Sequence, residues 1–162
     1  LGEYSLSSKA SIEDIEFVFK DLSHRFNLTI TFEEFLNTYY KYYDKVEYFK
    51  DVSEYEKSLK DSCFIGILSN LSVLDKSRID KQLNLSEYDY VFLSFEIGEV
   101  KPNKKIYEYV LNNVPFKGCD ILFLDDAEPN INAALSLGIN ACLVKGEDLD
   151  NIKLCVNKFL DE

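Results

Sequence analysis

The chain has 162 residues, 46% of them hydrophobic and 14% aromatic, which is enough to bury the core of one globular domain with a small appendage. Its formal net charge of -11 argues against nucleic acid and against an anionic membrane as partners, because both are bound through a basic face. No hydrophobic run approaches the roughly 20 residues of a membrane-spanning helix. An anionic small molecule screened by a metal ion is still compatible with this charge, and the oligomeric state is left open.

The cysteines give an expectation about redox state. The four of them are scattered, they form no Cys-x-x-Cys pair, and three lie in or beside hydrophobic runs. Such residues usually behave as small buried hydrophobes. We therefore interpret Cys63, Cys119, Cys142 and Cys155 as buried, reduced thiols, and we expect a cytoplasmic protein.

The first third of the sequence is predicted to form a pair of amphipathic helices. Ser11 can cap the first helix, because hydrophobic residues follow it at helical spacing and acidic residues occupy the first turn. Thr31 and Glu34 have the spacing of a second capping box. The tyrosine-rich stretch at 38–49 continues this second helix, and we interpret its rings as helix packing rather than as a substrate-binding wall.

From about residue 61 the pattern changes to short hydrophobic runs that alternate with helical stretches. The runs lack a helical period and are the candidate strands: 63–70, 90–94, 121–125 and 139–144. The helical stretches lie at 77–83, 103–113, 128–137 and 148–160. Strand and helix in alternation predict right-handed crossovers, a parallel sheet and helices on both faces. The predicted fold class is therefore α/β, with a Rossmann-like sheet.

Polar residues follow the candidate strands at the ends that meet one edge of such a sheet. Ser69 and Asn70 close the first run and present a hydroxyl and an amide to a phosphate oxygen, although Ser at such a junction is often only a helix cap. Lys101 precedes Pro102, which fits the first turn of the next helix and keeps Lys101 extended, so that its ammonium can point toward the strand ends. The alternative is a solvated surface lysine.

Two adjacent acids end the third run. Asp125 and Asp126 precede a helix and lie at the end of a parallel strand, where open α/β sheets bind ligands. Neighbouring carboxylates repel each other, so the pair favours a cation, and hard oxygen ligands accessible to water suit Mg²⁺. The competing interpretation is a helix cap followed by a first-turn acid. Asn130 lies one helical turn further on.

Ser69, Lys101 and the pair Asp125 and Asp126 close successive strands or open the helices after them, in one order. This order resembles motifs II, III and IV of the haloacid dehalogenase (HAD) superfamily, and the matching stretches are LSN, GEVKPNKKIY and FLDDAEPNINAALSLG. The chain resembles the phosphatase-like subfamily with a small helical cap. The resemblance implies a partial helical cap over 1–55 and a HAD-like α/β core over 56–162.

The resemblance also implies a reaction. In this superfamily an Asp of motif I attacks phosphorus and forms an aspartyl-phosphate, while Mg²⁺ neutralises charge on the phosphoryl group. The resemblance assigns Ser69 and Lys101 to catalysis, and the same two residues with Asn70 to substrate binding. It makes Asp126 a ligand of Mg²⁺ and Asp125 either a second ligand or a residue that supports one. The expected substrate is a small phosphorylated metabolite.

One part of the family pattern is missing from this sequence. No Asp-x-Asp follows a hydrophobic strand upstream of the cap, although the motif I strand lies at the centre of the sheet in the superfamily. Without it, two pairs of strands would keep unpaired inner edges. We therefore expect an N-terminally truncated sequence, a gene product longer by roughly 30 to 50 residues, and no catalysis by this stretch alone. Otherwise the half-sheets pair directly or another chain donates a strand.

Other functions are weighed against this enzyme. A HAD relative without catalysis could serve as a binding or regulatory module. A phospho-acceptor receiver domain also places acids, a hydroxyl and a lysine on a parallel sheet, but its acidic pair follows the first strand, whereas the order here is Ser, Lys, Asp-Asp. A dehalogenase is a minor option, because that branch uses no metal and the two acids favour one.

Overall fold

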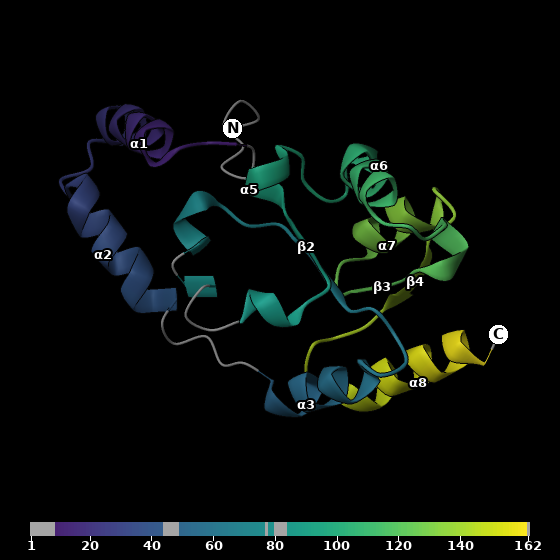
Figure 1. The fold of residues 1–162 in the computed structure, drawn as a ribbon. Helices are drawn as coiled ribbons and strands as arrows, with labels where there is room; N and C mark the ends of the chain where they lie inside the picture. Colours follow the sequence, from purple (N-terminus) through teal and green to yellow (C-terminus); the bar gives the residue numbers. More distant parts are fainter. Residues whose placement is uncertain (1–8, 44–48, 77, 80–83, 162) are drawn as a thin grey trace.

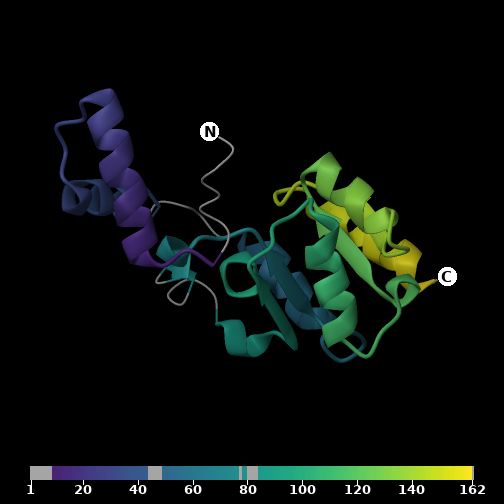
Figure 2. The ribbon, with the colours of Figure 1, turned by 90° about the horizontal axis from the view of Figure 1, so that it is seen from above.

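The computed structural model describes residues 9–43, 49–76, 78–79 and 84–161. Helices α1 (Ile12–Phe26) and α2 (Phe32–Tyr43) lie together on one side of the molecule in Figure 1, and the strands with the remaining helices form an α/β core. The view from above in Figure 2 shows the same division. The predicted fold class is confirmed.

Short parallel strands form two separate sheets. β1 (Gly66–Ser69) pairs with β2 (Tyr90–Leu93), and β3 (Leu122–Asp125) pairs with β4 (Asn140–Leu143). Each strand is shorter than the hydrophobic run that predicts it. Among the described residues, no strand pairs with the inner edge of β1 or of β3, and the two sheets do not pair with each other. Two separate pairs of strands agree with the expectation that a central strand lies outside this sequence, and that expectation stays a prediction.

Helices connect the strands. The α-helices of the core are α3 (Lys50–Leu59), α5 (Ser94–Ile97), α6 (Lys104–Asn113), α7 (Glu128–Leu135) and α8 (Leu149–Leu160), and the 3-10 turns are Val73–Asp75, Leu85–Glu87 and Gly118–Asp120. The helices predicted at 103–113, 128–137 and 148–160 are confirmed, with small differences at their ends. The helix predicted at 77–83 falls mostly outside the described residues.

One hydrophobic core spans both sheets. Tyr107 of α6 and Ala134 of α7 are buried at 1% and 0% exposure. Leu68 of β1 and Phe123 of β3 pack against the same cluster. Helices α6 and α7 therefore cover one face of the two sheets together, as Figure 1 shows, and these shared contacts hold the half-sheets side by side.

Both predicted capping boxes begin a helix. The Ser11 hydroxyl accepts the amide of Asp14 at 3.2 Å, and the Ser11 amide donates to the Asp14 carboxylate at 2.8 Å. The Thr31 hydroxyl accepts the Glu34 amide at 3.1 Å, and the Thr31 amide donates back at 2.7 Å. These bonds satisfy backbone donors that the start of a helix leaves open. The end of the predicted second helix, at 44–48, lies outside the described residues.

Aromatic rings pack α1 against α2. The ring of Phe19 lies 5.5 Å from that of Phe32 and 5.3 Å from that of Phe35, measured between centroids. Phe35 in turn contacts Tyr39 at 6.2 Å. The Tyr39 hydroxyl donates to a carboxylate oxygen of Asp75 at 2.8 Å, so α2 is bonded to the loop that follows β1. Within the tyrosine-rich stretch, these contacts confirm the packing interpretation for Tyr39, whereas Tyr42 is 75% exposed.

Helix α3 packs against the core and lies beside α8 in Figure 1. Its Val52 and Leu59 contact the cluster that contains Ile152 and Val156 of α8. The predicted boundary between cap and core, after residue 55, falls inside this helix. These contacts favour a boundary before α3, and the division into two domains stays a prediction.

Two of the cysteines form a disulfide, so the prediction of reduced thiols is wrong for them. Cys142 of β4 and Cys155 of α8 are paired, with their Cα atoms 6.4 Å apart. Cys63 is free and half-buried, and Cys119 is free and exposed. The spacing in the sequence does not reveal the pair, because only the packing of α8 on β4 brings the two sulfurs together. The expected cytoplasmic location loses this support and stays a prediction.

We searched the helices of the structure for a segment that could span a membrane. Within the described ranges, none of the helices combines the length and the apolar character that crossing a bilayer requires.

We expect the disulfide to stabilise the fold, because it closes a loop across a sequence separation of 13 residues. In the chain-entropy description such a loop contributes about 3 kcal/mol to the free energy of unfolding. The double variant Cys142→Ala/Cys155→Ala should therefore unfold at lower urea concentration than the wild type. A reducing agent should lower the wild-type midpoint to the same level and leave the double variant unchanged, with Cys119→Ala as the control. A wild-type midpoint that does not respond to reduction would contradict this role.

Candidate active site

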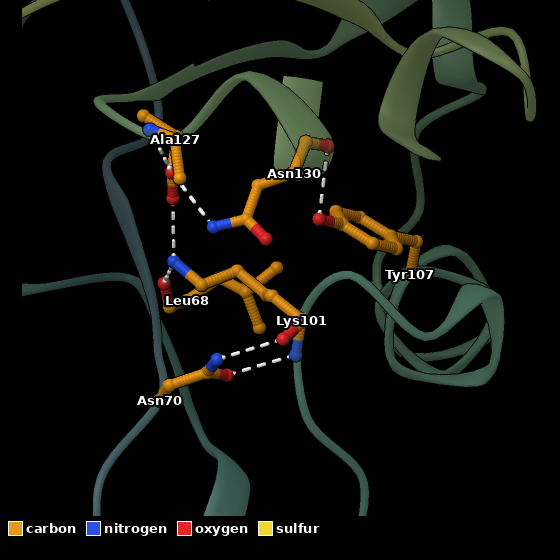
Figure 3. Close-up of polar contacts among 7 residues, drawn as sticks. Leu68, Asn70, Lys101, Tyr107, Ala127 and Asn130 are labelled. Atoms are coloured by element: carbon orange, nitrogen blue, oxygen red, sulfur yellow. Dashed lines mark hydrogen bonds and ion pairs between the residues drawn. The ribbon is translucent and has the colours of Figure 1, made fainter. Parts of the chain in front are cut away.

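The ammonium group of Lys101 lies between the two half-sheets (Figure 3). It donates to the backbone carbonyl of Leu68 in β1 at 2.9 Å and to Oδ2 of Asp125 at the end of β3 at 2.6 Å. The side chains of Lys101 and Asp125 are only 10% and 6% exposed. The lysine is thus buried at the strand ends, and the alternative of a solvated surface lysine is wrong.

The backbone of Lys101 is held by the side chain of Asn70. The Lys101 amide donates to Oδ1 of Asn70 at 2.8 Å, and Nδ2 of Asn70 donates to the Lys101 carbonyl at 2.9 Å. Pro102 follows through a cis peptide bond and precedes Asn103, the cap of α6. Pro102 therefore lies before the helix, and the prediction that it occupies the first helical turn is wrong.

The carboxylate of Asp125 is bonded through both of its oxygens. Besides the ion pair of Oδ2, its Oδ1 accepts the Ala127 amide at 2.9 Å and Nδ2 of Asn130 at 2.8 Å (Figure 3). Burial raises the pKa of Asp125, but the hydrogen bonds from Lys101, Asn130 and Ala127 together outweigh it and hold this pKa below its usual value of 3.8. Asp125 is therefore ionised at neutral pH.

A buried tyrosine supports Asn130 from the other side. The Tyr107 hydroxyl donates to the Asn130 carbonyl at 3.0 Å, and its side chain is 1% exposed. Burial, with the nearby charge of Asp125, raises the pKa of Tyr107 to about 12, so the hydroxyl keeps its proton. From the sequence, Tyr107 is predicted only to lie in a helix. Its contact with the Asn130 carbonyl joins two different helices and cannot be predicted from sequence spacing.

The two adjacent acids have different surroundings. Asp125 is buried against Lys101, which is the cation that its charge needs, whereas Asp126 is exposed to solvent. In the described ranges, no group of three or more His, Cys, Asp and Glu side chains is gathered as a metal site. Mg²⁺ is commonly held by one or two carboxylates together with water and phosphate oxygens, so an exposed acid beside a second one fits this part of a Mg²⁺ site.

Two serines at neighbouring strand ends behave differently. Ser69 ends β1, and in the described structure its side chain makes no hydrogen bond with the protein. Ser94, after β2, is fully buried, and its hydroxyl accepts the Leu71 amide at 2.8 Å and donates to the Leu71 carbonyl at 2.9 Å. Ser94 thus fixes the loop after Ser69. Sequence reasoning assigned it no role, although a hydroxyl closing a hydrophobic run was a signal.

The fold and these residues define a class of protein: an α/β domain of parallel strands whose polar groups converge at the carboxyl ends of those strands. The family model described as haloacid dehalogenase-like hydrolase matches residues 5–144. The chain therefore belongs to the haloacid dehalogenase-like hydrolase family, and the resemblance found in its motifs is confirmed.

Three curated proteins are similar to part of the chain. Pyrimidine 5'-nucleotidase YjjG of Escherichia coli (strain K12) is 30% identical over 88 residues, which are 52% of this chain and 39% of that protein. Bifunctional epoxide hydrolase 2 of Rattus norvegicus is 33% identical over 58 residues, 36% of this chain and 10% of that protein. Flavin mononucleotide hydrolase 1 of Arabidopsis thaliana is 30% identical over 71 residues, which are 43% of this chain and 29% of that protein. The matches span less than half of the length of each relative.

Two solved structures share the fold. A predicted HAD-like family hydrolase from Porphyromonas gingivalis has a TM-score of 0.76 at 22% identity, covering 100% of this chain and 82% of that one. The second is a HAD family enzyme from Bacteroides thetaiotaomicron in complex with magnesium and inorganic phosphate. Its TM-score is 0.70 at 17% identity, and the match covers 87% of this chain and 72% of that one. At such identities the likeness extends to the fold alone.

The lowered pKa of Asp125 makes the stability of the fold depend on pH. Its ion pair should stabilise the fold fully above pH 3.8 and lose that contribution as the pH falls through the lower folded-state value. Asp125→Asn should cost about 3 to 5 kcal/mol at neutral pH, because it leaves the ammonium of Lys101 buried without a counter-charge. The difference from wild type should shrink on acidification, because the wild-type carboxyl then also becomes neutral.

Urea unfolding at a series of pH values from neutral to strongly acidic measures this difference. Asp126→Asn, which changes an exposed carboxylate, is the matched control and should follow the wild-type pH dependence. A wild-type advantage over Asp125→Asn that stays constant with pH would disprove the assignment to this ion pair.

Proposed function

We propose that this chain is part of a Mg²⁺-dependent phosphohydrolase that acts on a small phosphorylated metabolite through an aspartyl-phosphate. The observation that carries the proposal is the position of the Lys101 ammonium, buried at the ends of β1 and β3 with Leu68 and Asp125 as its partners. A fixed positive charge at this edge would neutralise charge that develops on a phosphoryl group.

Ser69 would complete the binding of the phosphoryl oxygens. Its hydroxyl is available because no hydrogen bond within the described residues engages it, and it follows directly after Leu68, whose carbonyl accepts the Lys101 ammonium. A hydroxyl and an ammonium on adjacent parts of one strand end could donate to different oxygens of the same phosphate.

Asp126 and Asp125 would hold the Mg²⁺ ion, with Asp126 as the accessible ligand. When bound, Mg²⁺ supplies positive charge that offsets the charge of the transferred phosphoryl group. The Bacteroides thetaiotaomicron structure with magnesium and phosphate supports a site of this kind in the same fold. The names of two relatives, a pyrimidine 5'-nucleotidase and a flavin mononucleotide hydrolase, support a phosphate ester as the substrate class.

The attacking carboxylate would come from a strand outside residues 1–162. In support, the inner edges of β1 and β3 are both unpaired in the described structure, and Lys101 lies at the end of the space between them. A parallel strand placed there would deliver an Asp at its carboxyl end to the ammonium. That Asp would attack phosphorus as the ester P–O bond breaks, and water would then hydrolyse the acyl phosphate.

One observation favours a second candidate function. Both carboxylate oxygens of Asp125 already accept hydrogen bonds from the protein, which leaves Asp126 as the accessible acid. A non-catalytic module that binds a phosphorylated ligand through Lys101 and Ser69 would need no more than this.

Peptide complementation tests the proposal. With Mg²⁺, residues 1–162 alone should not hydrolyse p-nitrophenyl phosphate, whereas adding a peptide with a hydrophobic strand followed by Asp-x-Asp-x-Thr should produce turnover. A peptide with Asn in place of the first Asp should give none, and EDTA should abolish the activity. Ser69→Ala should lower kcat about 100-fold, the effect of losing one donor to the reacting group, without changing the urea midpoint.

The alternative has a distinct outcome. Absence of turnover with every peptide, together with binding of inorganic phosphate that Ser69→Ala weakens, would favour the non-catalytic module. Absence of both turnover and phosphate binding would contradict both functions.

A further inference from the structure

Three consecutive residues at the end of β1 contact or flank Lys101 in different ways. The Leu68 carbonyl accepts the ammonium of Lys101, Ser69 presents its hydroxyl, and the Asn70 amide bonds the backbone of Lys101. The lysine is therefore held at both of its ends by one strand terminus, as Figure 3 shows.

The side chain of Asn70 makes the same pair of hydrogen bonds to a backbone, one accepted and one donated, that a neighbouring β-strand would make. Its Oδ1 accepts from the Lys101 amide at 2.8 Å and its Nδ2 donates to the Lys101 carbonyl at 2.9 Å, across a sequence separation of 31 residues. Only a side-chain amide offers a donor and an acceptor in one plane, so Asp, Ser or Ala at this position would lose at least one of the two bonds.

Lys101 needs such support because of where it lies. It occupies a turn between α5 and α6, outside any helix or strand, and its carbonyl is joined to Pro102, which has no N–H to offer. Its long side chain must still reach Leu68 and Asp125, and ordering a lysine side chain is costly in entropy. Fixing the backbone of Lys101 reduces the number of conformations available to the residue, and so lowers the entropy cost of placing its ammonium there.

We propose that Asn70 is a positioning residue: it holds the Lys101 backbone so that the ammonium reaches the space between β1 and β3, and it influences the phosphoryl group only through Lys101. This assignment differs from the sequence-based prediction that Asn70 itself binds substrate. Its consequence for phosphate binding rests on the proposed function, whereas its effect on Lys101 does not.

Amide hydrogen exchange of Lys101, followed by NMR, tests the positioning directly. Asn70→Ala should speed exchange of the Lys101 amide about tenfold, as expected for the loss of one hydrogen bond. The matched control is Asn103→Ala in the same loop. It removes the α6 cap, in which Oδ1 of Asn103 accepts the Lys105 amide, and the bond that Nδ2 of Asn103 donates to Glu99, but it removes no bond to Lys101. Asn70→Asp should keep the protection, because its carboxylate still accepts this amide. Unchanged exchange in Asn70→Ala would overturn the proposal.

A double-mutant cycle on the binding of inorganic phosphate, in the presence of Mg²⁺, tests the route of the effect. Asn70→Ala and Lys101→Met should each weaken binding, and the double variant should bind no more weakly than Lys101→Met alone. Additive losses would overturn the proposal, because they would mean that Asn70 contacts the anion itself. If the wild type binds no phosphate, the proposed function fails, and the exchange measurement still decides whether Asn70 positions Lys101.

Discussion

The ion pair between Lys101 and Asp125 is the interaction on which the arrangement of the strand ends depends. Removing two charges from water is costly, and their attraction compensates only when the remaining donors and acceptors are also satisfied. Here the Leu68 carbonyl, the Ala127 amide and the Asn130 side chain complete the hydrogen bonding. Because Leu68 belongs to one half-sheet and Asp125 to the other, this polar network connects two sheets that share no backbone ladder within the described residues.

Much of the fold is predictable from local patterns. The capping boxes at Ser11 and Thr31 use bonds within one turn, and strands and helices alternate as their hydrophobic periods predict. That Ser69 and Asp125 lie at the same edge also follows, because parallel strands place their carboxyl ends together, and Lys101 reaches this edge from the turn before α6. What sequence spacing cannot supply is the choice of partners, such as Tyr107 for the Asn130 carbonyl, since that choice depends on how helices pack.

The differences from prediction have the same origin. Adjacent acids look equivalent in a sequence, but one strand end buries Asp125 beside Lys101 and leaves Asp126 in solvent. Cys142 and Cys155 look isolated until α8 packs on β4. The side-chain amide of Asn70 bonds the backbone of Lys101, a partner that the sequence does not indicate, and its role in substrate binding stays a prediction. In each case a contact between segments that are distant in the sequence determines the environment of the residue.

The hydrogen bond between Tyr39 and Asp75 connects helix α2 to the loop that follows β1. Asp75 is 7% exposed and also accepts the amide and hydroxyl of Ser72, so its carboxylate is fixed in the loop that begins after Ser69. A rotation of α2 would therefore pull on the short loop that follows Ser69. The hydrogen bond of Tyr39 thus couples the helical pair to the loop after β1, and a movement of α2 would be transmitted to that loop.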